Sequence, residues 1–307
     1  MAACRPSPNT RLWNVLRVCV CACGVMQSFF VSPSAFGQGR LEALRQDVRV
    51  ADPDATSVPP NPPPPSRPEE PSCNGYHPEH NDGCNQGNDG LTAGVFWLTL
   101  GAVTSPFWAP HTALDDDFSV ARSFARYPYA DASGYMLLGQ PEGSRQWSAQ
   151  FSADYATTFD DLSRVGGHLL VDSAWRWGVD TEMGYFQENL PHNGHDNLWL
   201  GDCNLVFRFA QNENMLWRTG VGLNWLDDSR HTDFGFNFTY GFDWFPRKPW
   251  VVSAAIDWGN LGYSGLFHFR GTVGVLVNRI EAYTGYEYYD FDHVQTNALI
   301  GGVRLWF

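Results

Sequence analysis

The stretch that decides the fold is Asp233-Phe-Gly-Phe-Asn-Phe-Thr-Tyr-Gly-Phe-Asp-Trp-Phe245. Every second side chain from Phe234 to Trp244 is a large aromatic ring, and the side chains between them are small or polar. A period of two indicates a β-strand with one apolar and one polar face. Sheets buried inside soluble proteins are rich in branched aliphatic residues, whereas Trp and Tyr gather where a protein meets lipid headgroups. The stretch therefore predicts a strand of a transmembrane β-barrel.

The same alternation recurs in nine further stretches, which makes ten predicted strands. They cover residues 147–155, 163–175, 179–185, 199–209, 217–225, 233–245, 250–258, 267–277, 280–290 and 297–307. Their connections alternate between short turns and longer loops rich in Asp, His and Asn. Short turns face the periplasm and long loops face outside in bacterial barrels, and strand numbers are even. We therefore predict an all-β, antiparallel, up-and-down barrel of about ten strands, with twelve possible if residues 85–145 add two.

The N-terminal region carries the features of an export signal. Residues 1–37 combine dispersed arginines, an apolar stretch at 18–31 and small residues at 35–37, which predicts a signal peptide. A second interpretation is a lipidation signal that would acylate Cys23. After this leader the sequence has no run of 18 apolar residues, so helical membrane spans are not expected.

Three segments follow the leader. Residues 38–72 are rich in proline, which disfavours sheet and predicts a disordered or extended linker. Residues 73–145 are rich in loop signals and are expected to form either a plug or cap or two additional strands. The consecutive acids Asp115 to Asp117 are interpreted as a solvated turn rather than a calcium site, because EF-hand spacing is missing. Residues 146–307 form the predicted barrel.

Cys73 and Cys84 flank two histidines, His77 and His80, within twelve residues. Two thiols and two imidazoles could complete a zinc site. However, the order of the ligands does not match the usual zinc fingers, and export places thiols where disulfides form. We favour a disulfide between Cys73 and Cys84 over a metal site, and we expect Cys203 to be a small lipid-facing residue.

Composition limits the partners that this chain would bind. The net charge is −13, which disfavours nucleic acid. Aromatic residues make up 15% of the chain and charged residues only 17%, as suits a barrel whose outer face contacts lipid. The expected partners are outer-membrane lipid, small polar or cationic solutes, and the barrel assembly machinery, which would engage the C-terminal Phe307. No cofactor is expected.

Four stretches resemble a known group of proteins. They are Gly222-Leu-Asn-Trp-Leu-Asp-Asp228, Phe234-Gly-Phe-Asn-Phe-Thr-Tyr-Gly241, Glu281-Ala-Tyr-Thr-Gly-Tyr-Glu287 and the closing Val303-Arg-Leu-Trp-Phe307. Together they resemble a family of uncharacterised planctomycete outer-membrane barrel proteins, over roughly residue 90 to the end of the chain. The resemblance implies an exported barrel and a location in the cell outer membrane, and it implies no activity.

The strand phase also predicts which charged side chains face the lumen. Because unpaired buried charges are costly, we expect a structural network of ion pairs near the periplasmic end, made of Arg208, Arg218, Arg304, Asp180, Asp243 and Glu281. A second group is expected nearer the outer rim, made of Asp257, His268, Arg270 and Glu287.

Three functions are compatible with these features. The first is a structural or surface-interaction barrel whose lumen is filled by ion pairs. The second is a narrow pore that prefers cations, because inward carboxylates outnumber inward arginines. The third is a hydrolase or acyltransferase at the rim, for which the loop residues Asp227, Asp228, His231, Asp292 and His293 supply suitable side chains. No motif fixes their geometry, so an enzyme is not expected. A secreted sandwich or cup would instead require the aromatic face to be covered by protein.

Overall fold

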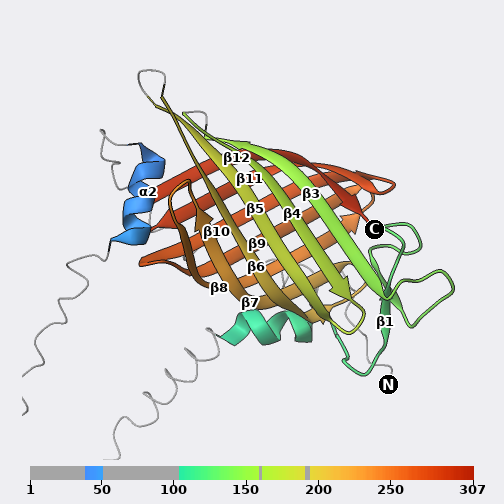
Figure 1. The fold of residues 1–307 in the computed structure, drawn as a ribbon. Coiled ribbons are helices and arrows are strands. Elements are labelled where there is room, and N and C mark those ends of the chain that lie inside the picture. Colours follow the sequence, from blue (N-terminus) through green and yellow to red (C-terminus); the bar gives the residue numbers. More distant parts are fainter. Residues whose placement is uncertain (1–38, 51–103, 159–160, 191–193) are drawn as a thin grey trace, which may run out of the picture. The chain divides into compact units, whose positions relative to one another are not determined.

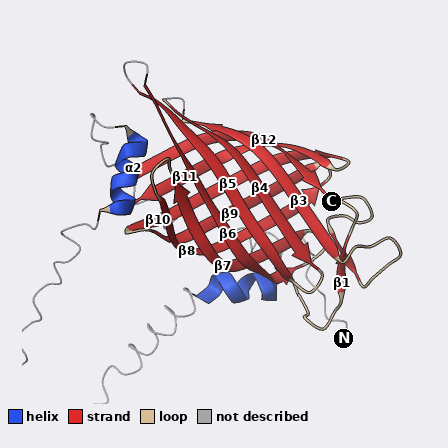
Figure 2. Ribbon diagram, viewed as in Figure 1, coloured by secondary structure: helices blue, strands red, loops and turns tan. Residues whose placement is uncertain are grey.

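A computed structural model describes residues 39–50, 104–158, 161–190 and 194–307. Its main element is a closed barrel of ten antiparallel strands that are adjacent in the order of the chain. Figures 1 and 2 show these strands wrapping around a common axis. The strands are β3 (Trp147–Thr157), β4 (Leu162–Ser173), β5 (Trp177–Leu190), β6 (Gly194–Gln211), β7 (Met215–Asp227), β8 (Thr232–Arg247), β9 (Trp250–Leu261), β10 (Ser264–Val277), β11 (Ile280–Phe291) and β12 (Val294–Trp306). All ten predicted strands are confirmed.

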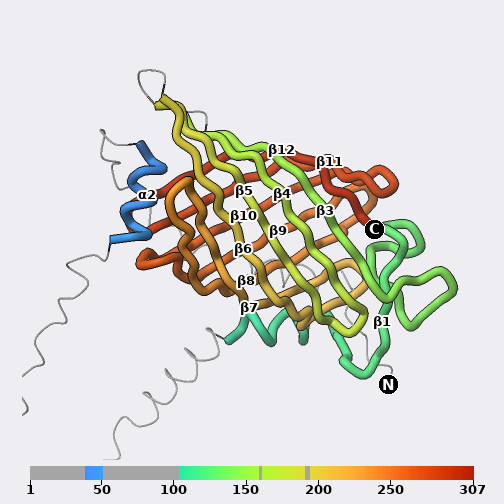
Figure 3. Tube along the Cα trace, viewed as in Figure 1, coloured from blue at the N-terminus to red at the C-terminus, as the bar shows by residue number. Residues whose placement is uncertain are grey.

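The last strand closes the barrel on the first. β12 runs antiparallel to β3, with Val303 opposite Ala153 and Arg304 opposite Ser152. Figure 3 shows the two strands side by side. Closure leaves no strand edge with unpaired backbone groups, which is a requirement inside lipid.

The two faces of the strands follow the predicted alternation. Phe234 and Trp258 are 63% and 69% exposed on the outer face, whereas Asn237 and Asp243 are buried inside. Within the described residues no protein covers these two rings, whereas a secreted cup would require such a cover. One exception is Trp217, which has the phase of the outward-facing Val221 and Leu223 and is yet only 3% exposed. It packs in a cluster with Phe209 and neighbouring outward rings, and Leu114 lies against this cluster.

Residues 116–145 close the mouth at which β3 begins and β12 ends, which we call the terminal mouth. Here β1 (Arg122–Phe124) and β2 (Met136–Leu138) form a separate two-stranded sheet and add no strand to the barrel. Phe124 and Tyr135 pack with Phe245 and Trp306 in a buried cluster. The ring centroids of Tyr135 and Trp306 are 5.2 Å apart, so aromatic packing closes this end.

The acidic turn is only partly solvated, contrary to expectation. Asp116 is buried and accepts two hydrogen bonds from Arg176, at 2.7 and 2.9 Å. It also accepts a hydrogen bond from the backbone N–H of Gln211. Asp116 thus anchors the segment to the turn between β4 and β5, because a buried carboxylate needs such partners.

The opposite mouth is covered by α2 (Arg40–Arg49), and we call it the α2 mouth. Figure 1 shows α2 and the C-terminus at opposite ends of the barrel. The prediction of a linker beginning at residue 38 was wrong for this helix. Its apolar face packs onto a ring of barrel side chains, which are Leu162, Phe186, Leu198, Leu200, Leu226, Leu261, Leu266, Tyr289 and Phe291.

A further helix covers residues 104–113. Among the helices of the described residues, none combines the length and the hydropathy needed to cross a membrane. The predicted signal peptide at 1–37, the proline-rich residues 51–72 and the pair Cys73 and Cys84 lie outside the described residues. Those predictions remain predictions.

Candidate functional site

The lumen holds a network of ion pairs near the α2 mouth, centred on Arg164 of β4. This guanidinium lies 2.9 Å from Asp154, 3.2 Å from Glu182 and 2.8 Å from Glu287. Arg270 of β10 pairs with the same Asp154 and, at 2.9 Å, with Glu182. The five residues, which we call the α2-side network, come from five strands and link opposite walls of the barrel. Each of these buried charges needs such partners, because a buried charge left unpaired is costly.

Small residues make room for Arg164. Gly166 follows it on the inward face of β4, and Gly184 faces it from β5. A Cβ atom added to Gly166 would lie 2.1 Å from the Arg164 guanidinium, and one added to Gly184 would lie 2.9 Å from its Cδ. Side chains at these two positions would therefore occupy the volume that the arginine needs.

His268 extends the α2-side network to β9. Its Nδ1 lies 3.0 Å from Asp257 and its Nε2 3.3 Å from Glu287. The imidazole also stacks on Tyr289, with ring centroids 4.1 Å apart. Tyr289 belongs to the apolar cluster beneath α2, so the network lies directly below the layer that closes this mouth.

The same region brings together three groups that could ligate a metal. Ligand atoms of Glu182, His268 and Glu287 lie within 4.8 Å of one another. However, Arg164 donates to both carboxylates and Arg270 pairs with Glu182. Guanidinium groups already contact both oxygens of Glu182 and both oxygens of Glu287, so the donor set does not fit a cation.

A second network, the terminal-side network, lies toward the other mouth. Arg218 of β7 lies 2.8 Å from Asp172 of β4 and 2.7 Å from Asp243 of β8. Arg208 of β6 approaches Asp172 at 3.4 Å, and its Nε donates to Gln211 at 2.6 Å. The Arg208 guanidinium also lies 4.8 Å from the ring centre of Phe124, which joins this network to the aromatic cluster of the terminal mouth.

Arg304 and Glu281 complete the terminal-side network on β12 and β11. Arg304 lies 3.3 Å from Glu281 and donates to the hydroxyl of Ser253 at 3.1 Å. Glu281 also accepts a 2.8 Å hydrogen bond from the indole N–H of Trp306. Ser253 in turn donates to Asp243, so the two halves of the network are connected.

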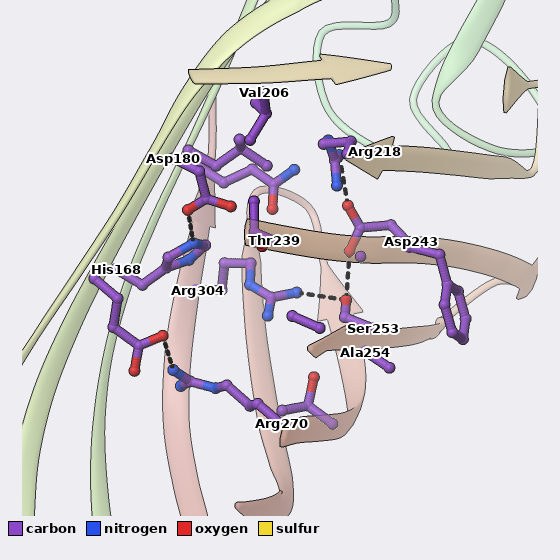
Figure 4. Close-up of a pocket in the computed structure, with 17 residues that line it drawn as sticks. His168, Asp180, Val206, Arg218, Thr239, Asp243, Ser253, Ala254, Arg270 and Arg304 are labelled. Atoms are coloured by element: carbon purple, nitrogen blue, oxygen red, sulfur yellow. Dashed lines mark hydrogen bonds and ion pairs between the residues drawn. The ribbon is translucent and has the colours of Figure 1, made fainter. Parts of the chain in front are cut away.

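A small cavity lined by both polar and apolar side chains lies between the two networks (Figure 4). In its wall His168 lies 2.5 Å from Asp180, while Arg304 extends toward Ser253 and Arg218 toward Asp243. The cavity leaves about 70 Å³ for the centres of water molecules. Since one water needs roughly 10–15 Å³ of such space, the cavity holds only a few waters.

Five of the six residues predicted to form an ion-pair network near the periplasmic end lie together in the terminal-side network. Of the group predicted near the periplasmic end, Asp180 is the member that pairs elsewhere, with His168 in the cavity wall. The other members lie in the terminal-side network, which is made of Asp172, Arg208, Arg218, Asp243, Glu281 and Arg304.

The predicted rim group is connected and lies toward the α2 mouth, but it is covered, which the sequence did not predict. Asp257, His268, Arg270 and Glu287 are all buried. They lie beneath the apolar cluster that α2 covers. The prediction also missed Arg164, although its even spacing from the inward His168 and Asp172 gave a usable signal.

The loop residues considered for catalysis do not form a common centre. His293 is largely exposed and pairs with Asp47 of α2 at 3.1 Å. Asp228 binds Arg49, and Asp292 accepts a hydrogen bond from the backbone N–H of Gly265. The backbone of His231 contacts Asp228. These contacts hold the loops and α2 together. They give no support to the hypothesis of a hydrolase or acyltransferase, which remains untested.

Comparison with known proteins gives a likeness in fold. The chain matches no known protein family and has no significant sequence similarity to a curated protein, so its resemblance to planctomycete proteins stays a prediction. A loop-deletion mutant of OmpT, an outer membrane protein of Vibrio cholerae, is 9% identical over 61% of this chain and 74% of that chain, with a TM-score of 0.29. The KdgM porin is 10% identical over 52% and 99%, with a TM-score of 0.25. Ail, the attachment invasion locus protein of Yersinia pestis, is 14% identical over 52% and 96%, also with a TM-score of 0.25.

Proposed function

We propose that this protein is an outer-membrane barrel with a structural and surface-interaction role, whose lumen is closed to solutes. The observation that carries the proposal is the filling of the lumen. Buried arginines and carboxylates bridge its walls at two levels, and apolar clusters cover both mouths. A solute would have to separate these buried pairs, and separating buried charges is costly.

The membrane location rests on the outer face of the barrel. Large apolar side chains are exposed on every barrel strand of the described residues, Phe151, Leu169, Val179, Leu205, Leu223, Phe236, Trp258, Val273, Tyr286 and Leu299 among them. A soluble protein rarely exposes a continuous apolar surface of this extent. Folded protein in detergent should migrate faster on a gel before boiling than after it, and unchanged migration together with solubility in plain buffer would contradict the membrane location.

Liposome swelling tests the closed lumen. Proteoliposomes containing the folded protein should swell in small sugars and amino acids no faster than protein-free liposomes. A porin of known permeability serves as the positive control. Swelling that rises with the amount of folded protein would overturn the proposal.

A narrow cation-preferring pore is the second candidate, and the lumen charge favours it. Carboxylates outnumber arginines among the described lumen residues, and Asp180 and Asp202 lack an arginine partner among the ion pairs of the described chain. If a current is found, its reversal potential in a salt gradient tests whether the pore prefers cations. A shift toward the cation equilibrium potential supports it, and an anion-selective or unselective current excludes it.

A further inference from the structure

The mouth under α2 recognises this helix through its backbone at the N-terminus. α2 begins after Gly39 without a side-chain cap of its own. Glu188 of β5 supplies the cap instead, because its carboxylate accepts hydrogen bonds from the backbone N–H groups of Arg40 at 2.7 Å and Leu41 at 2.9 Å. A carboxylate at this end also interacts favourably with the helix dipole.

Two arginines one turn apart make the second set of contacts. Arg45 forms a two-point contact with Asp196 of β6, at 2.6 and 2.7 Å, and its Nε lies 2.9 Å from Asp228. Arg49 lies 2.9 Å from the same Asp228 and 2.8 Å from Asp233. Planar guanidinium groups suit such paired contacts with carboxylates. The mouth thus selects two arginines spaced four residues apart.

The third set of contacts is apolar. Leu41, Leu44 and Val48 lie on one face of α2 and are buried against the barrel. Their spacing of three and four residues is that of an amphipathic helix laid into a groove. Cap, arginines and apolar stripe therefore specify both the register and the direction of the bound helix.

The two partners differ in how much structure they have by themselves. A helix of ten residues is marginal in water, so α2 needs the barrel in order to be stable. The acceptors on the barrel side lie on β5, β6, β8 and the β7–β8 loop, and these strands are held by the closed sheet. Most of the acceptors for α2 are therefore held by strands that do not depend on the helix, whereas the helix depends on them.

We propose that the α2 mouth is a binding site for short basic amphipathic helices, and that α2 is its resident and exchangeable ligand. The occupant is a helix with apolar residues at positions i, i+3 and i+7 and arginines at i+4 and i+8, as in Leu41 to Arg49. The inference deepens the proposed surface-interaction role, and it names the chemistry of the partner. A helix of this pattern from another molecule would displace α2 and take over its contacts.

The test uses a variant that lacks residues 39–50, folded in detergent, and a fluorescent peptide with the sequence of those residues. Fluorescence anisotropy should show saturable binding. The intact protein should bind the peptide far more weakly, because its own tethered α2 competes at roughly millimolar effective concentration. Replacing Asp228→Asn in the deletion variant should weaken binding by about tenfold or more, since two charge-assisted contacts are lost.

Matched controls separate recognition from charge alone. Asp131→Asn removes an acid near the terminal mouth that pairs with Arg126 and should leave binding unchanged, as should a peptide with Gln46→Ala, which alters an exposed position. A scrambled peptide of identical composition should bind much more weakly. Equal binding of the scrambled peptide, or no binding to a folded deletion variant at roughly 1 mM peptide, would overturn the proposal.

A second variant covers the case in which the deletion prevents folding. A protease site inserted after Val50 allows the full chain to fold before α2 is cut free. Excess labelled peptide should then replace the cut helix, faster in about 1 M salt, where ion pairs are screened. A cut helix that is never replaced would overturn exchange. If the helix exchanges but the barrel makes liposomes permeable, the binding site is supported and the closed lumen is wrong. If liposomes stay impermeable but the helix does not exchange, the closed lumen is supported and the binding site for exchangeable helices is wrong.

Discussion

Arg45 of α2 and Asp196 of β6 form a two-point ion pair although 151 positions separate them in the sequence. The pair fixes the N-terminal helix at the mouth remote from Trp147 and Trp306, where the barrel strands begin and end. Both ends of an outer-membrane barrel of even strand number face the periplasm. We therefore predict that α2 lies on the side of the barrel that faces out of the cell.

The side of α2 can be measured with Gln46→Cys, which places a thiol at an exposed position of the helix. A membrane-impermeant maleimide should label this variant in intact cells above the level of the unmodified protein. Asp131→Cys, near the terminal mouth, is the control that should react only after the outer membrane is permeabilised. Labelling of the first variant only after permeabilisation would show that α2 faces the periplasm.

Acid should release α2. Burial raises the pKa of Asp228, but hydrogen bonds from Arg49 and from the backbone N–H groups of His231 and Arg230 outweigh it and hold this pKa well below its ordinary value. A lowered pKa in the docked state means that the stabilisation is complete above about pH 4 and is lost as the pH falls below that value. A fluorophore on Gln46→Cys should report release in that range.

The control for this pH dependence is Asp228→Asn. In this variant a larger fraction of α2 should be undocked at neutral pH than in the unmodified protein. The further release of α2 on acidification should be smaller than in the unmodified protein. An unchanged acid transition in this variant would show that Asp228 is not the group responsible.

Arg164 should be the most sensitive charge in the barrel. Arg164→Met leaves Asp154, Glu182 and Glu287 with fewer partners, and breaking a buried ion pair from one side costs about 3–5 kcal/mol. Chemical unfolding in detergent would measure the loss. Arg126→Met, which breaks an exposed pair with Asp131, should cost less than about 1 kcal/mol, and similar losses for the two variants would contradict the central role of Arg164.

A methyl group added at Gly166 tests whether the space around Arg164 is fully occupied. Gly166→Ala places its Cβ against the Arg164 guanidinium and the Asp154 carboxylate, both of which are fixed by other contacts. We expect a destabilisation of about 1–3 kcal/mol, as is typical of overpacking. Gly301→Ala is the matched control, because its nearest neighbour atom is 4.0 Å away, and it should be close to neutral.

The sequence predicted the barrel well because its signal is local and repeated. Each strand shows its two faces within a few residues, as Phe234 to Trp244 do, and the same period assigns Arg218, Asp243 and Glu281 to the lumen. Which charges pair is set by the register between strands, so Asp180 could not be assigned to His168 from alternation alone.

The helix α2 was missed for a different reason. Its apolar pattern, Leu41, Leu44 and Val48, spans only ten helical residues beside a proline-rich segment. What stabilises it is a set of carboxylates on the barrel, of which Glu188 is 147 positions from Leu41. A contact between such distant segments leaves no mark in the local sequence. The same holds for Asp116, whose partner Arg176 is 60 positions away.

Planar-bilayer recording tests the closed lumen most directly. The intact chain is purified in folded form, and its insertion into the bilayer is verified independently. It should give no current above the baseline across many insertions. Current steps of constant size that scale with the amount of folded protein, and that vanish with heat-unfolded protein, would contradict a lumen filled by ion pairs and closed at both mouths.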